Sequence, residues 1–204
     1  METNTIKTQL PTLKCLSRYK VVLGSNSPRR RELLSGLDID FEVRTILGID
    51  ESYPETLEAK DIPVYLAQKK AEAYLATMPD DELLITADTI VWTFNEILGK
   101  PKDREEAIAM LQQLSAREHE VITGVCLTTK EKSVSFASVS SVRFAKLEEE
   151  DIIYYVDKYR PFDKAGSYGI QEWIGYIAVE SINGSFYNVM GLPVRLLYQE
   201  LKQF

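Results

Sequence analysis

Three consecutive arginines at a predicted helix start are the residues in this sequence most suited to binding an anion. They occupy positions 29–31, directly after the run Gly-Ser-Asn-Ser-Pro at positions 24–28. A helix start already carries partial positive charge, so cations there favour a phosphate that meets backbone donors and guanidinium groups together. The alternative is that the arginines point to solvent or pair with surface acids such as Glu32. Because two serines and a tight turn precede them, we favour an oxyanion site. It is not a P-loop, since no G-x-x-x-x-G-K-[ST] motif occurs.

A carboxylate within an apolar segment is the second candidate. The run Leu-Leu-Ile-Thr-Ala at 83–87 predicts a buried strand that continues through Asp88 and Thr89. A carboxylate in such a strand is costly unless it is paired, protonated or bound to a metal, so Asp88 stands out from the acids on helix surfaces. Lys70 lies among apolar neighbours on a predicted helix, where its spacing alone favours a snorkelling side chain. Lys100 stands in a constrained Gly-Lys-Pro loop.

A glycine-containing loop at 161–171 is a third candidate. It holds Lys164, two glycines and a terminal Gln171, whose amide could read a base edge through one donor and one acceptor. An ordinary connecting loop has the same composition, and both alternatives stay open on these residues alone. His119 is the only histidine, and we expect a structural role for it.

Hydrophobic periodicity predicts alternating strands and helices around these residues. Ser27 suits an N-cap, Pro28 suits the first helical position and Gly36 suits the helix end. Asp103, with Glu106 three residues later, resembles a capping box. We predict strands at 21–23, 41–44, 83–94, 121–129, 133–144 and 174–182, and helices that begin near residues 28, 61, 103, 147 and 193.

Length and charge narrow the class of protein. The chain has 204 residues and no linker-like or repetitive tract, which predicts a single α/β domain at 21–204 after an N-terminal extension at 1–20. A net charge of −7 argues against a nucleic-acid coat or a binder of anionic membranes. Cys15 and Cys126 show no metal or redox spacing, so we expect free thiols. No signal-peptide core or membrane-length apolar run occurs, and we expect a cytoplasmic protein.

Six runs in the sequence together resemble the Maf family of nucleotide pyrophosphatases. They occur in the family's order and span most of the chain, from about Val21 to Leu201. Each run alone is a weak signal, and the ordered set is a strong one. The runs are Ser25–Arg30, Ala87–Val91, Gly99–Asp103, His119–Val125, Asp163–Gln171 and Asn188–Pro193.

The resemblance implies both a fold and a reaction. It implies an elongated mixed β-sheet flanked by helices, with two lobes and a central cleft as in the ITPase-like proteins, and a homodimer. It also implies hydrolysis of a nucleoside triphosphate to the monophosphate and diphosphate with Mg²⁺, Mn²⁺ or another divalent cation. No nucleic acid or membrane partner is expected.

The resemblance also implies roles for particular residues. One group would hold phosphate: Ser25, Arg29 and Arg30. A second group would form the acidic, metal-binding side of the cleft, with Asp88 as the proton acceptor: Glu51 and Asp88. A third group would meet the phosphate chain as part of the catalytic set: Lys70 and Lys100.

The loop at 161–171 resembles the subfamily that acts on dTTP and UTP, in which Arg29, Thr89 and Gln171 match positions tied to substrate choice. The family usually has glycine after this glutamine, whereas this chain has Glu172 and Trp173. We therefore expect a charge and a bulky ring beside the base pocket. Two alternatives remain: a house-cleaning pyrophosphatase for non-standard purine triphosphates such as dITP, and a nucleotide-binding regulator of cell division.

Overall fold

The computed structural model describes residues 12–204, and the first part of the predicted extension lies outside this range. Within it, seven strands form one sheet in the order β2-β1-β3-β5-β6-β7, with β4 paired to β3. The strands are β1 (Lys20–Leu23), β2 (Phe41–Val43), β3 (Glu82–Thr93), β4 (Glu96–Leu98), β5 (Glu118–Thr128), β6 (Ser133–Phe144) and β7 (Val179–Asn183). The helices are η1 (Lys14–Arg18), α1 (Pro28–Ser35), α2 (Ile62–Leu75), α3 (Arg104–Leu114), α4 (Glu149–Tyr159), η2 (Ala165–Ser167), α5 (Trp173–Ala178), α6 (Phe186–Met190) and α7 (Val194–Gln203).

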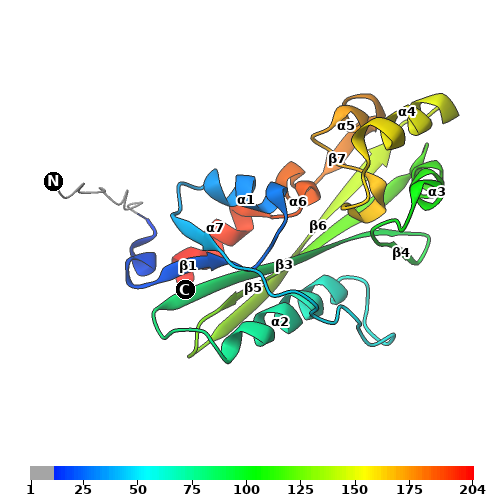
Figure 1. Ribbon diagram of the computed structural model, residues 1–204. Helices are drawn as coiled ribbons and strands as arrows, with labels where there is room; N and C mark the ends of the chain where they lie inside the picture. The colour runs from blue at the N-terminus through cyan, green and yellow to red at the C-terminus, as the bar shows by residue number, and fades with distance from the viewer. Residues whose placement is uncertain (1–11) are drawn as a thin grey trace.

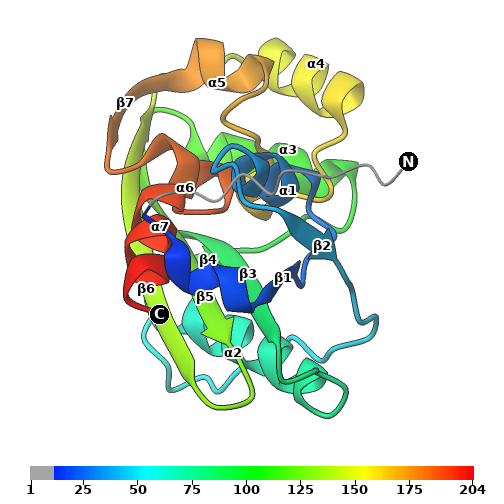
Figure 2. The same ribbon diagram turned by 90° about the vertical axis from the view of Figure 1, so that its left-hand side faces the viewer.

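The sheet is mixed and elongated. β1 runs parallel to β2 and β3, whereas β3, β5 and β6 form a long antiparallel ribbon that sets the length of the molecule (Figure 1). Helices α4 and α5 lie together at one end of this ribbon, well away from α2, in both views (Figures 1 and 2). The predicted α/β fold with a mixed sheet flanked by helices is confirmed.

The side chains of β3 alternate between the two faces of the sheet, and each face packs in a hydrophobic cluster of its own. Leu83 and Ile85 pack in a large cluster with residues of α1 and α7, while Leu84 packs in a second cluster with residues of α2. Because successive strand residues point to opposite faces, Asp88 projects toward α2 and Thr89 projects toward α1 and α6. The strand therefore presents two adjacent polar side chains to two different sets of helices.

The start of α1 follows the local rules that predicted it. The Ser27 hydroxyl accepts a hydrogen bond from the Arg30 N–H, Pro28 occupies the first turn, and Gly36 is the C-cap. Asp103 likewise caps α3 through the Glu106 N–H at 2.8 Å. These caps satisfy helix N–H groups that have no intrahelical partner, which explains why the helices begin where they do.

The predicted strand at 174–182 is wrong in its first half, because residues 173–178 form α5 and only β7 is extended. Ile174 and Ala178 are fully buried and lie four residues apart, which is the spacing of one helical face. Gly175 packs so closely on Ile170 that a Cβ atom there would lie 1.8 Å from the Ile170 carbonyl oxygen. The helix expected to begin near residue 147 is confirmed with a shifted start, as α4 begins at Glu149 and ends at Tyr159.

The described end of the predicted extension packs on the C-terminal helix. Leu13 is buried in the main core, and the Cys15 thiol donates to the Leu201 carbonyl oxygen at 3.0 Å. Cys15 and Cys126 are both free, as predicted. Among residues 12–204, no helix is long and apolar enough to cross a membrane.

Candidate active site

A cleft of about 490 Å³ opens beside the middle of β3. The pairing of β3 with β1 ends at Ile85, and its pairing with β4 begins at Val91. In the described part of the chain no strand pairs with β3 between these two positions on that side, so both Asp88 and Thr89 reach the cleft from the strand edge. The rest of its lining comes from the loops after β1, β2 and β4, from α1, α2 and β5, from the segments around η2, and from the end of α6.

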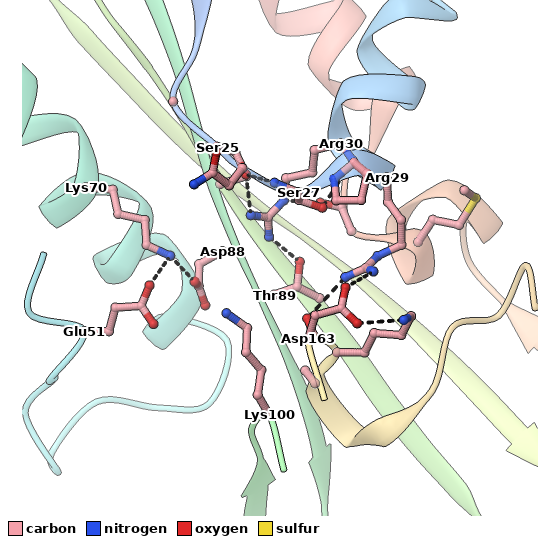
Figure 3. A pocket seen from close by; sticks show the side chains of 18 of the residues that line it. Ser25, Ser27, Arg29, Arg30, Glu51, Lys70, Asp88, Thr89, Lys100 and Asp163 are labelled. Carbon is pink, nitrogen blue, oxygen red and sulfur yellow. Dashed lines mark hydrogen bonds and ion pairs between the residues drawn. The ribbon is translucent and has the colours of Figure 1, made fainter. Parts of the chain in front are cut away.

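The Arg30 side chain lies on the floor of the cleft, where three uncharged oxygen atoms accept its hydrogen bonds (Figure 3). Its guanidinium donates to the Gly191 carbonyl at 2.9 Å, to the Thr89 hydroxyl at 3.0 Å and to the Ser25 hydroxyl at 3.3 Å. Burial lowers the pKa of Arg30, although the charge of Asp88 opposes this shift. No ion pair found within residues 12–204 involves Arg30, so its charge is available to an anion.

Arg29 leaves α1 in another direction and pairs with Asp163 at 2.7 Å. Burial opposes ionisation of Asp163, but its hydrogen bonds and charge contacts with Lys164 and Arg29 outweigh this and bring its pKa to about 2. Arg31 is exposed and does not line the cleft. The predicted oxyanion site therefore receives two of the three arginines.

The opposite side of the cleft is acidic and centres on a lysine. Lys70 on α2 contacts an oxygen of Asp88 at 2.5 Å and an oxygen of Glu51 at 2.9 Å (Figure 3). The side chains of Lys70 and Asp88 are 15% and 14% exposed. The expectation of a snorkelling Lys70 is therefore wrong, because the ammonium is drawn inward by two carboxylates. Burial would raise the pKa of Glu51, but the hydrogen bond and charge of Lys70 lower it overall.

Lys100 is exposed and lines the same cleft. Its side chain extends from the loop after β4 toward Asp88 and Glu51 (Figure 3). The structure thus brings together all four residues expected to form the catalytic set, although they come from four separate segments of the chain.

The donors around Lys70 fit a hard divalent cation bound together with substrate. Glu51 and Asp88 supply two carboxylates, and Mg²⁺ commonly takes one or two carboxylates while keeping waters and substrate phosphates as further ligands. Across residues 12–204 no group of three or more His, Cys, Asp or Glu side chains is placed to hold a metal by itself.

Gln171 lines the cleft, and its side-chain Oε1 is buried without a hydrogen-bond partner in the described structure. Glu172 and Trp173 do not themselves line the cleft, so the expectation of a ring beside the base pocket is wrong, whereas the Glu172 carboxylate lies close behind the lining residue Gly169. The Glu172 carboxylate pairs with the cleft-lining Lys164 at 3.1 Å, and Trp173 packs edge-on against Tyr154.

Several lining residues had no role assigned from the sequence alone. Asp163 and Lys164 were visible only as neighbouring charges shortly before Gly166, whereas the ion pair of Asp163 with Arg29 joins segments 134 residues apart. Gly191 supplies a carbonyl to Arg30, and its φ of 113° suits glycine. His119 is structural, as predicted: its Nε2 lies 2.7 Å from the Tyr168 hydroxyl, and burial lowers its pKa to about 4.

Comparison with known proteins places the chain in a family. A model of the Maf-like protein family matches residues 20–204. A dTTP/UTP pyrophosphatase from Parabacteroides distasonis is 69% identical over 192 residues, covering 94% of this chain and 100% of that protein. A dTTP/UTP pyrophosphatase from Bacteroides fragilis is 60% identical, covering 92% of this chain and 97% of that protein. A dTTP/UTP pyrophosphatase from Flavobacterium psychrophilum is 53% identical, covering 91% and 94%. The chain belongs to the Maf-like family.

Proposed function

We propose that this protein hydrolyses dTTP and UTP to the monophosphate and diphosphate. The names of relatives that are 53–69% identical over nearly the whole chain support the substrates. One observation at the edge of β3 supports the chemistry. There the cation Arg30 has, among residues 12–204, only uncharged partners such as Thr89, whereas the carboxylate of Asp88 pairs with Lys70. A triphosphate could meet positive charge and a proton acceptor in the same cleft.

The cationic side would hold and polarise the phosphates. Arg30 and Ser25 present donors on the cleft floor, and Lys100 approaches from the opposite loop. Donors that are fixed before substrate arrives stabilise the charge that develops on phosphoryl oxygens without reorganisation during the reaction. Lysine and arginine together would also stabilise the departing diphosphate.

Asp88 would accept the proton of the attacking water. In this step the water oxygen forms a bond to phosphorus, the α–β phosphoanhydride bond breaks, and the diphosphate leaves with the bonding electron pair. Lys70 holds the Asp88 carboxylate at a fixed position, which leaves its second oxygen for the water. General-base assistance of this kind contributes roughly 10²- to 10⁴-fold to the rate.

Glu51 and Asp88 would hold the divalent cation, which when bound supplies charge neutralisation and makes a water more acidic. We therefore propose that turnover depends on Mg²⁺ or Mn²⁺, and that the protein works in the cytoplasm as a homodimer. Light scattering of the purified protein checks the dimer.

Gln171 would read the pyrimidine edge, with Thr89 and Arg29 also near the substrate. Thymine and uracil present an N–H donor beside a carbonyl acceptor, which a glutamine amide can match with its oxygen and its NH₂ group. The Oε1 of Gln171 is buried and has no hydrogen-bond partner in the described residues, so the chain itself leaves this acceptor unused.

A product analysis tests the proposal. The purified protein is incubated with Mg²⁺ and each of dTTP, UTP, CTP, GTP and dITP, and products are separated by ion exchange. We expect monophosphate and diphosphate in equal amounts, with dTTP and UTP turned over fastest. Nucleoside diphosphate with inorganic phosphate, or a clear preference for dITP, would contradict the proposed function.

A further inference from the structure

A row of alternating charges runs from the lining of the cleft to Glu172, next to the loop that carries Gln171. It begins at Arg29, which pairs with Asp163 at 2.7 Å. Asp163 pairs with Lys164 at 2.7 Å, and Lys164 pairs with Glu172 at 3.1 Å. The other Glu172 oxygen accepts the hydroxyl of Tyr155. These contacts join α1, the loop before η2, the start of α5 and α4.

Glu172 uses its carboxylate for this row instead of a nearby helix. It occupies the N-cap position of α5, yet its side chain makes no capping hydrogen bond. Its two partners are instead Lys164, whose side chain is 9% exposed, and Tyr155, which is fully buried. A carboxylate held from two sides by buried donors is a rigid group on which a neighbouring loop can pack.

The loop that carries Gln171 packs directly on this carboxylate. The Tyr155 oxygen accepts the Gly169 N–H at 3.1 Å, and the Glu172 N–H donates back to the Gly169 carbonyl at 2.9 Å. A Cβ atom at Gly169 would lie 2.9 Å from the Glu172 carboxyl carbon and 3.1 Å from the Gln171 Nε2. Gly169 therefore lies beside both the Glu172 carboxylate and the Gln171 amide, and the turn at Gly169 connects the two groups.

The orientation of the Gln171 amide matters because an amide can read two different pyrimidine edges. Uracil presents an N–H and a carbonyl, whereas cytosine presents a ring nitrogen acceptor and an amino group. A freely rotating amide can match either edge by turning over. Selectivity for uracil and thymine therefore depends on the groups that fix the glutamine.

We infer that Glu172 is a positioning residue for base selection. Held by Lys164 and Tyr155, it fixes the turn at Gly169 and thereby the amide of Gln171. This inference rests on the proposed function. It gives a role to the residue at which the chain departs from the glycine expected after Gln171.

The test compares kcat and KM for UTP and CTP in the wild type, Glu172→Gln, Gln171→Ala and the double variant. We expect Glu172→Gln to lower the UTP-to-CTP ratio of kcat/KM by about three- to fivefold, mainly through the KM for UTP. In the Gln171→Ala background, Glu172→Gln leaves the ratio unchanged, because it acts through Gln171. Inhibition by tripolyphosphate, which has no base, stays within twofold of the wild type. Glu180→Gln, an exposed carboxylate paired with Arg143, is the matched control and changes none of these values.

Two results would overturn the inference. One is an unchanged UTP-to-CTP ratio in Glu172→Gln, and the other is an equal change in the presence and absence of Gln171. If Glu172→Gln does not fold, the Tyr155→Phe variant, which lacks only the hydroxyl, is measured in its place. An unchanged UTP-to-CTP ratio of kcat/KM in that variant overturns the inference. A wild-type protein that cleaves neither nucleotide refutes the proposed function and the inference with it, whereas a selective wild type with an insensitive variant refutes the inference alone.

Discussion

Two cations reach the edge of β3 from opposite faces of the sheet, and they differ in what neutralises them. Arg30, on the α1 side, meets a hydroxyl of Thr89, a hydroxyl of Ser25 and a backbone carbonyl. Lys70, on the α2 side, meets the carboxylates of Asp88 and Glu51. The first group keeps its positive charge for an arriving anion, whereas the second forms a patch with one excess negative charge. One strand edge thus separates the phosphate-binding role from the cation- and water-binding role.

A substitution on the acidic side of the cleft should have the largest effect on turnover. Asp88→Asn preserves the size of the side chain but removes the proton acceptor and one of the two carboxylates at Lys70. We expect turnover of dTTP to fall by roughly 10²- to 10⁴-fold while circular dichroism shows an intact fold. Asp80→Asn, at an exposed carboxylate paired with Lys130, is the control and retains full activity. Near-normal turnover by Asp88→Asn would remove Asp88 from the mechanism.

A substitution on the cationic side of the cleft should lower activity less, because the other two cations, Arg29 and Lys100, remain. We expect Arg30→Ala to lower kcat/KM for dTTP by roughly 10- to 100-fold, since hydrogen bonds to charged groups contribute about 1.5–3 kcal/mol. Arg31 follows directly but is exposed outside the cleft, so Arg31→Ala should stay close to wild type. Equal losses in the two variants would mean that general surface charge, and not the Arg30 position, binds the phosphates.

The cleft wall that carries Gln171 should influence the choice between nucleotides more than the rate of hydrolysis. Gln171→Ala removes the donor and the acceptor that we propose read the base, and a net hydrogen bond is worth about 1 kcal/mol. We therefore expect the ratio of kcat/KM for UTP over CTP to fall by roughly fivefold in steady-state assays. A uniform loss for both nucleotides would assign Gln171 to positioning the phosphates.

The smallest expected effect is on the stability of the fold. It concerns the ion pair of Arg29, the cleft arginine with a carboxylate partner, and Asp163. The pKa of Asp163 is about 2 in the folded protein, below the ordinary value of 3.8, so its ion pairs stabilise the fold above pH 4 and lose this effect as the pH falls through 2. Because the Asp163 side chain is 54% exposed, we expect less than about 1 kcal/mol. Urea unfolding of wild type and Asp163→Asn between pH 7 and 2.5 measures it. A stability difference that grows on acidification would have the wrong sign.

Local signals predicted the elements well. Ser27 and Pro28 marked the start of α1, and the alternating runs before and after residues 130–132 predicted the antiparallel pair β5 and β6. The error at 174–182 arose because a short apolar run fits a buried strand and a helical face equally well. The close packing of Gly175 on Ile170, which decides between them, is a tertiary contact that no local pattern contains.

The site was predictable as a set of residues, mainly through the family resemblance, but not as a set of contacts. The spacing of Lys70 on its helix favoured a solvated lysine, since nothing near it in sequence shows that Asp88 lies 2.5 Å away. The position of the Glu172 carboxylate was likewise hidden, because it depends on contacts with Lys164 and Tyr155. Pairings of this kind are set by how distant segments pack.

A crystal structure with Mg²⁺ and a dTTP analogue whose α–β bridge cannot be cleaved tests the central claim most directly. We predict that the triphosphate lies across the edge of β3, with its oxygens on Ser25 and Arg30 and with the cation between it and the carboxylates of Glu51 and Asp88. A triphosphate bound away from Ser25 and Arg30, or a cation bound far from Asp88, would contradict this division of the cleft.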